Sequence, residues 1–195
     1  MSYQRKSLIT PEEYLAIERK SEIKNEYYAG DVFAMVGASK QHNLIAANVI
    51  RVLGNQLVDR PCNVYPSDMR VKVSATGKYT YPDVVVACEE ELFDDAEKDT
   101  LLNPVLIVEI LSESTEAYDR GKKFEQYQYI ESLTEYLLIT QEPYRVEQYV
   151  RQSNREWRYS EYHDADDEVT INIIGCRLPL KDVYAKIAQS SPRTA

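Results

Sequence analysis

The chain has 195 residues, of which 44% are hydrophobic, and a formal net charge of −9. No apolar run approaches the roughly 20 residues of a membrane-spanning helix, and the N-terminus carries no apolar signal segment. We therefore expect a cytoplasmic protein without a membrane partner. The even composition predicts a single domain over residues 1–195.

The negative charge argues against a nucleic-acid partner, but it is unevenly distributed along the chain. Residues 89–99 hold seven acids against Lys98 alone, and residues 161–168 hold five acids and no lysine or arginine. The remaining residues hold 20 acids against 22 bases. A basic surface elsewhere on the molecule is therefore compatible with the composition.

The chain contains three cysteines, Cys62, Cys88 and Cys176. Their number is odd and their spacing is not paired, which predicts neither a disulfide framework nor a zinc site. We expect all three to be small core residues.

The first predicted element is a short helix that begins at Thr10-Pro11, with Thr10 as N-cap and Glu13 completing a capping box. A hairpin that turns at Gly30 follows it, and Glu26 lies at the start of this hairpin. Taken alone, Glu26 is most simply interpreted as an exposed acid at a strand end.

A longer helix is predicted over residues 39–57 from its apolar spacing, with His42 on its first turn. A lone histidine in this position is more often a hydrogen-bonded surface or core residue than a ligand. The remaining elements are predicted in chain order as a strand over 63–73, a strand over 82–87, a solvated loop or short exposed helix over 89–99, a strand over 104–111, a helix over 115–131, a strand over 134–140, antiparallel strands over 145–150, 157–162 and 169–174, a helix over 180–187 and a tail over 190–195.

This order of elements predicts an αβββαβ core over about residues 26–140. A C-terminal β extension and helix follow over about residues 144–188. The fold class is α/β or α+β, depending on how the strands pair, with helices flanking a mixed sheet.

Two acids stand out on the predicted core strands. Glu109 lies inside an apolar run that reads as a strand buried on both faces, where an ionised carboxylate is costly unless it is paired. If this strand runs antiparallel to the strand over 82–87, Asp83 and Glu109 lie at nearly the same height, about 5 Å apart. Two such carboxylates share either a proton or a cation. Oxygen ligands of this type suit Mg²⁺ or Mn²⁺.

The following helix adds a row of polar side chains. Asp119, Lys123 and Tyr127 are spaced by four residues and share one face, and Lys122 pairs with Gln126 in the same way. A lysine facing the scissile phosphate of a bound nucleic acid stabilises developing negative charge. The simpler alternative is an exposed Asp119–Lys123 pair worth only ~0.3–0.5 kcal/mol, which leaves Glu109 unexplained.

Three separated segments resemble a known family. They are Tyr81-Pro82-Asp83-Val84-Val85-Val86, then Pro104 to Ser112 with Glu109, then Tyr118 to Phe124 with Tyr127. Together they resemble the PD-(D/E)XK restriction-endonuclease-like superfamily and, within it, the bacterial Uma-type endonuclease family. The resemblance extends over most of the chain and implies a restriction-endonuclease-like fold.

One position departs from the superfamily pattern, which has a lysine two residues after the second acid. Leu111 occupies that position here. The resemblance implies that the lysine has moved to the next helix, with Lys123 as the first candidate and Lys122 as the second. The resemblance also makes His42 and Glu26 candidates for secondary site residues. Asp68, which precedes the hydrophobic alternation of the preceding strand, is a further candidate for the acidic cluster, alongside Asp119, Gln126 and Tyr127 from the spacing above.

We expect a divalent-metal-dependent nuclease that acts on DNA as a homodimer, with Asp83 and Glu109 holding Mg²⁺ or Mn²⁺ and Lys123 completing the catalytic set. Two alternatives stay open. One is a catalytically weak or inactive nuclease-fold scaffold that binds a protein or nucleic-acid partner through residues 89–99 and the tyrosine-rich strands over 144–162. The other is a metal-dependent hydrolase of RNA or another phosphoester.

Overall fold

The computed structural model describes residues 8–154 and 156–187. Its centre is a six-stranded mixed sheet in the order β11-β10-β9-β8-β6-β3. Within this sheet β8 and β9 are parallel, and the other pairs are antiparallel. The six strands are β3 (Cys62–Pro66), β6 (Val84–Cys88), β8 (Leu106–Ile110), β9 (Glu135–Ile139), β10 (Val146–Ser153) and β11 (Glu156–Tyr162).

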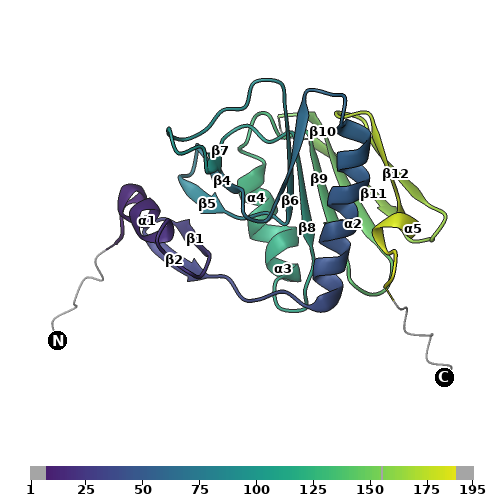
Figure 1. Ribbon diagram of the computed structural model, residues 1–195, viewed down its shortest axis with the longest axis horizontal. Coiled ribbons are helices and arrows are strands. Elements are labelled where there is room, and N and C mark those ends of the chain that lie inside the picture. Colours follow the sequence, from purple (N-terminus) through teal and green to yellow (C-terminus); the bar gives the residue numbers. More distant parts are fainter. Residues whose placement is uncertain (1–7, 155, 188–195) are drawn as a thin grey trace.

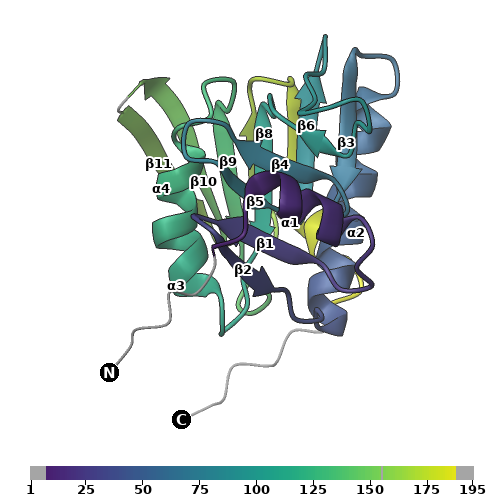
Figure 2. The same ribbon diagram turned by 90° about the vertical axis from the view of Figure 1, so that its left-hand side faces the viewer.

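A second sheet of five strands was not expected from the sequence. Its order is β2-β1-β5-β4-β7, and it covers part of the larger sheet together with the N-terminal helix α1 (Pro11–Glu18), as Figure 2 shows. The strands are β1 (Asn25–Tyr28), β2 (Asp31–Ala34), β4 (Arg70–Val73), β5 (Lys78–Thr80) and β7 (Thr100–Leu101).

The helices lie on opposite faces of the six-stranded sheet (Figure 1). One face is covered by α2 (Lys40–Leu57), against which α5 (Leu180–Val183) and the hairpin of β12 (Glu168–Ile171) and β13 (Cys176–Pro179) pack. The other face carries α3 (Glu116–Tyr118), a π turn η1 (Asp119–Lys123) and α4 (Phe124–Tyr127).

The strands distribute their side chains alternately between two cores. Leu106, Val108 and Ile110 of β8 join the core under α2, whereas Ile107 joins the core under α4. The odd-numbered residues of β8 therefore face α4, and Glu109 faces the same side.

The predicted αβββαβ core is confirmed as α2, β3, β6, β8, the α3–α4 segment and β9. The first helix is also confirmed, because Thr10 caps α1 with a complete capping box. Among the described helices, none is long and apolar enough to cross a membrane.

Several element boundaries were predicted wrongly, three of them by the largest margin. The strand over 63–73 is two strands, since Pro66 ends β3 and a turn closed by Met69 N–H to the Pro66 carbonyl (3.0 Å) sends β4 into the other sheet. The helix over 115–131 is interrupted by the π turn and ends at Tyr127. The helix over 180–187 ends at Val183, and the tail over 190–195 lies outside the described residues.

The acidic segment 89–99 is a loop with mostly exposed residues, as predicted, but some of its acids are paired and not simply solvated. Asp94 forms an ion pair with Lys72 (2.6 Å). Asp99 binds both Arg19 (2.8 Å) and the buried Arg70 (2.8 Å). These pairs fasten the loop to α1 and to the five-stranded sheet, because buried or half-buried cations need partners.

The expectation of three unpaired cysteines was also wrong. Cys62 and Cys88 are register partners on β3 and β6 and form a disulfide. Their spacing of 26 residues gives no hint of this pairing, which depends on strand register. Cys176 is free and buried, as expected for a core residue.

Replacing Asp99 with asparagine should destabilise the protein at neutral pH, and progressively less as the pH falls towards the lowered pKa of Asp99. Hydrogen bonds from Arg19, with the charge of Arg70 adding to them against the opposing effect of burial, hold the pKa of Asp99 well below its usual range. A lowered folded-state pKa contributes stability above the ordinary value near ~3.9, and this contribution is lost as the pH falls. Thermal unfolding at pH 7 and about pH 3 measures the effect.

Glu97→Gln is the matched control, because it removes the same charge from an exposed position of the same loop. Equal melting temperatures for the Asp99→Asn and Glu97→Gln proteins at pH 7 would contradict the prediction.

Candidate active site

Asp83 and Glu109 meet at the end of the β6–β8 pair. Val84 is the register partner of Val108, so one step further along the ladder sets Asp83 opposite Glu109. Asp83 also anchors the end of β8, because its Oδ2 accepts the backbone N–H of Ile110 (2.7 Å). Antiparallel register thus brings together two acids that lie 26 residues apart in the sequence.

Lys123 is the centre of a cluster of buried charges. Its Nζ lies 2.9 Å from Glu109 Oε1 and 3.5 Å from both Asp119 Oδ1 and Glu26 Oε1. The side chain is only 7% exposed. The η1 turn supplies Lys123 and Asp119, β8 supplies Glu109, and β1 supplies Glu26.

The five-stranded sheet contributes a second set of contacts around Glu26. Thr80 donates a short hydrogen bond to Glu26 Oε1, and Lys78 Nζ lies 3.6 Å from Oε2. The hydroxyl of Tyr118 is 3.5 Å from Oε2. Lys78 and Thr80 were not predicted, because β5 was missed; the alternation from Lys78 to Tyr81 was the available signal.

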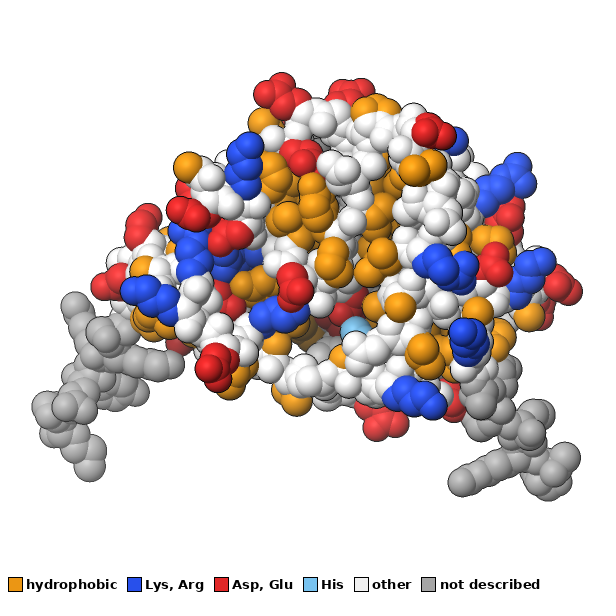
Figure 3. Space-filling view, in the orientation of Figure 1, with side chains coloured by type: hydrophobic (Ala, Val, Ile, Leu, Met, Phe, Trp, Pro, Cys, Tyr) orange, Lys and Arg blue, Asp and Glu red, His pale blue; other side chains and the backbone are white. Residues whose placement is uncertain are grey.

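His42 and Tyr127 orient the two central acids. His42 Nε2 lies 3.1 Å from Asp83 Oδ2, and the Tyr127 hydroxyl donates to Glu109 Oε1 (2.8 Å). His42 comes from the first turn of α2, which Ser39 caps. In the space-filling view a histidine and an acidic side chain lie side by side in a hollow near the lower end of α2 (Figure 3). The side chains of His42 and Asp83 are 15% and 13% exposed, more than those of Lys123 and Glu109, so the solvent-accessible edge of the cluster is on this side.

Burial and charge act in opposite directions on the pKa values of this cluster. Burial raises the pKa of Glu109 to about 8, although Lys123 acts to lower it. Burial also raises the pKa of Asp119. The pKa of Glu26 is lowered, because Lys123 and Lys78 outweigh its burial. Burial lowers the pKa of Lys78, whereas the surrounding carboxylates raise that of Lys123 above its usual value despite burial.

Three candidates do not join the cluster. Asp68 lies in the turn after β3, its side chain is 83% exposed, and it pairs with Lys24 (2.7 Å). Lys122 is exposed on the outer side of η1. Gln126 is half-buried, and its Oε1 has no hydrogen-bond partner among the described residues. Asp68 was expected on a strand beside the acidic cluster. Because β3 ends at Pro66, Asp68 lies in a turn instead.

The donor set fits a hard divalent cation with few protein ligands. Among the described residues, no group of three or more His, Cys, Asp and Glu side chains forms a complete metal site. Within that same part of the chain, the hydrogen bonds and ion pairs of both central acids fall on a single oxygen, Oδ2 of Asp83 and Oε1 of Glu109. The second oxygen of each acid is available to a cation, and Mg²⁺ needs only one or two carboxylates when water and phosphate complete its shell.

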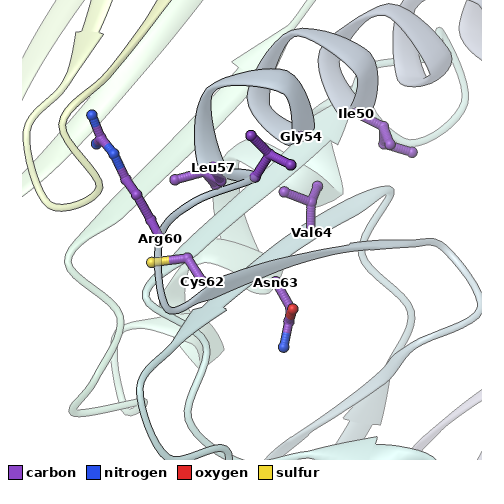
Figure 4. A pocket seen from close by; sticks show the side chains of 8 residues that line it. Ile50, Gly54, Leu57, Arg60, Cys62, Asn63 and Val64 are labelled. Atoms are coloured by element: carbon purple, nitrogen blue, oxygen red, sulfur yellow. The ribbon is translucent and has the colours of Figure 1, made fainter.

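A pocket of about 290 Å³ lies apart from this chemistry, between the C-terminal half of α2 and β3 (Figure 4). Ile50, Leu57 and Val64 contribute to its lining. No carboxylate or lysine lines it, so it lacks the ionisable groups that the charged cluster brings together.

An αβββαβ mixed sheet with two acids at adjacent strand ends and a buried lysine beside them defines a restriction-endonuclease-like fold. The comparison with known families agrees. The Uma2 family model, described as "Putative restriction endonuclease", matches residues 11–181. The chain belongs to the Uma2 family.

Similar proteins cover nearly the whole chain. Two uncharacterized proteins of Synechocystis sp., sll1609 and slr1290, are 36% and 34% identical to it over 86% and 92% of its length, and the matches span 94% and 93% of those proteins. The crystal structure of a "putative nuclease belonging to DUF820" from Anabaena variabilis superposes with a TM-score of 0.76 at 19% identity. That match covers 92% of this chain and 99% of the other, and it establishes the shared fold.

Removing the Lys123 amine should destabilise the protein far more than removing the neighbouring one. Lys123→Ala leaves Glu109, Glu26 and Asp119 buried without their shared cation, and breaking a buried ion pair in this way costs about 3–5 kcal/mol. Lys122→Ala changes an exposed side chain and should stay within about 0.5 kcal/mol.

Urea unfolding of both variants in a chelating buffer measures the difference. Equal losses of unfolding free energy in the two variants would contradict the prediction, because they would show that the ion pairs of Lys123 contribute no more than an exposed lysine.

Proposed function

We propose that this protein is a divalent-metal-dependent nuclease that hydrolyses phosphodiester bonds of DNA. The observation that carries the proposal is the pair of opposed acids, Asp83 and Glu109, with the buried Lys123 only 2.9 Å from Glu109. A scaffold that merely binds a partner has no need of this costly arrangement of buried charges. The match to the Uma2 family supports the same chemistry.

Asp83 and Glu109 are the residues that would hold Mg²⁺ or Mn²⁺. When bound, such an ion supplies a Lewis acid that polarises the phosphate and lowers the pKa of the attacking water. His42 holds Asp83 in place, and Tyr127 holds Glu109, through the hydrogen bonds described above. These contacts keep both acids oriented before substrate arrives.

Lys123 acts on the substrate and on the acids. Its ammonium group stabilises the negative charge that develops on the phosphoryl oxygens, because a fixed charge in a site with little water requires no reorganisation during the reaction. Its ion pair with Glu109 also favours the ionised carboxylate that a cation requires. Lys122 is the control for this role, since it carries the same charge one residue away at an exposed position.

Cleavage of plasmid and single-stranded DNA with Mg²⁺ or Mn²⁺ tests the reaction. Glu109→Gln and Asp83→Asn should abolish detectable cleavage. Lys123→Ala should lower the rate by about 100-fold or more, as loss of a charge-stabilising group does. Lys122→Ala should cleave at the wild-type rate. A wild-type protein inactive with both ions would refute the nuclease proposal, and loss in Lys122→Ala but not in Lys123→Ala would reassign the lysine.

Calorimetric titration with Mn²⁺ tests the metal site separately from catalysis. The wild-type protein should bind Mn²⁺, and Asp83→Asn and Glu109→Gln should each lose measurable binding, because each removes a charged oxygen ligand. The Asp68→Asn protein is the control, since that acid is exposed and paired with Lys24 outside the cluster. Unchanged binding in both site variants would show that the cation sits elsewhere.

A further inference from the structure

Phe33 lies at the edge of the charged cluster. It is the register partner of Glu26 in the β1–β2 hairpin, and directly opposed residues in an antiparallel pair project from the same face. Glu26 faces Lys123, so Phe33 occupies the side of the sheet on which the cluster lies. Its side chain is 53% exposed.

A second aromatic ring flanks the same acid from the opposite element. Tyr118 comes from α3, and its hydroxyl lies 3.5 Å from Glu26 Oε2 and hydrogen-bonds to Lys78. The hydroxyl group is held inside the site, while the residue remains 39% exposed. Glu26 thus has two exposed aromatic residues as neighbours, Phe33 opposite it in the hairpin and Tyr118 at its carboxylate.

On the opposite face of the same sheet, the aromatic residues are buried and not exposed. Tyr27 and Tyr79, which alternate with the site-facing residues of β1 and β5, pack with Tyr14 of α1, with ring centroids 5.0 to 5.9 Å apart. All three are buried. The rings on that face stabilise the fold, whereas Phe33 and Tyr118 leave apolar surface open beside the candidate catalytic groups.

The charges of the protein favour a ligand that is held through its bases. The net charge is −9, and tight binding of duplex DNA depends on many lysines and arginines that neutralise phosphates. Cations are scattered among acids on the face shown in Figure 3. Salt bridges with acids engage many lysines and arginines of the described residues, among them Arg19, Lys24, Arg70, Lys72, Arg120, Arg145 and Arg177.

We propose that Phe33 and Tyr118 form a stacking platform for unpaired nucleobases next to the scissile phosphate, so that the substrate is a single strand or an unpaired segment of nucleic acid. Aromatic side chains stack on any base, and they reach bases only where the bases are not paired. A duplex keeps its bases inside the helix and would meet this surface with its charged backbone. This inference rests on the proposed nuclease function and adds the class of its substrate.

Binding of a fluorescent 20-nucleotide single strand to the full chain tests the platform, with the same sequence as a duplex for comparison. A chelating buffer prevents cleavage during the measurement. Phe33→Ala should weaken single-strand binding about tenfold or more, as loss of one stacked base does. Phe33→Trp should retain the affinity, and Phe33→Leu, which is apolar but not aromatic, should not. Tyr129→Ala is the control, because Tyr129 is equally exposed (55%) beyond α4.

Cleavage assays then separate this inference from the proposed function. Wild-type cleavage of the single strand in preference to the duplex, lost selectively in Phe33→Ala, supports both. Cleavage of both forms at equal rates, with Phe33→Ala unchanged in binding and rate, overturns the platform and leaves the nuclease intact. Binding that depends on Phe33, without cleavage of either form in Mg²⁺ or Mn²⁺, supports the platform and overturns the nuclease.

Discussion

The buried ion pair between Lys123 and Glu109 is the interaction on which the site depends. Removing either charge from water costs several kcal/mol, and the cost is recovered only when partners surround it closely. Lys123 has three acids within 3.5 Å, and Glu109 has both an ammonium and a tyrosine hydroxyl. Asp83, Glu109, Asp119 and Glu26 share this small volume with two lysines, Lys123 and Lys78. The proposed divalent cation would offset the repulsion between these carboxylates.

This constraint explains why the small sheet lies where it does. Glu26 on β1 and Lys78 on β5 reach the cluster only because the five-stranded sheet packs over the α3–α4 side of the core. The small sheet is in turn fixed by the acidic loop, through the contacts of Asp99 with Arg70 of β4 and Arg19 beyond α1. Acids that raise the net negative charge therefore also support the architecture around the site.

The sequence was most informative where residues close in the chain decide the structure. The capping box at Thr10 and the apolar period of α2 follow from local spacing, and the apolar runs of β6 and β8 marked both as buried strands. It failed where long-range pairing decides. The five-stranded sheet, the Cys62–Cys88 disulfide and the place of Asp68 all depend on which strand lies beside which. Lys78 was not predicted either, because its strand β5 has only three residues and pairs with the distant strand β1.

The π turn at Asp119–Lys123 changes the spacing by which this site can be traced in other sequences. In a regular α-helix of 3.6 residues per turn, a residue eight positions along has rotated by about 80° past two full turns. Asp119 and Tyr127 nevertheless serve one cluster, because a π turn accommodates one additional residue within the helix. An uninterrupted helix would bring the same aspartate, lysine and tyrosine together at spacings of four and three residues. A search pattern that requires aspartate, lysine and tyrosine at two equal intervals of four residues would therefore miss relatives whose helix keeps these side chains but lacks the additional residue.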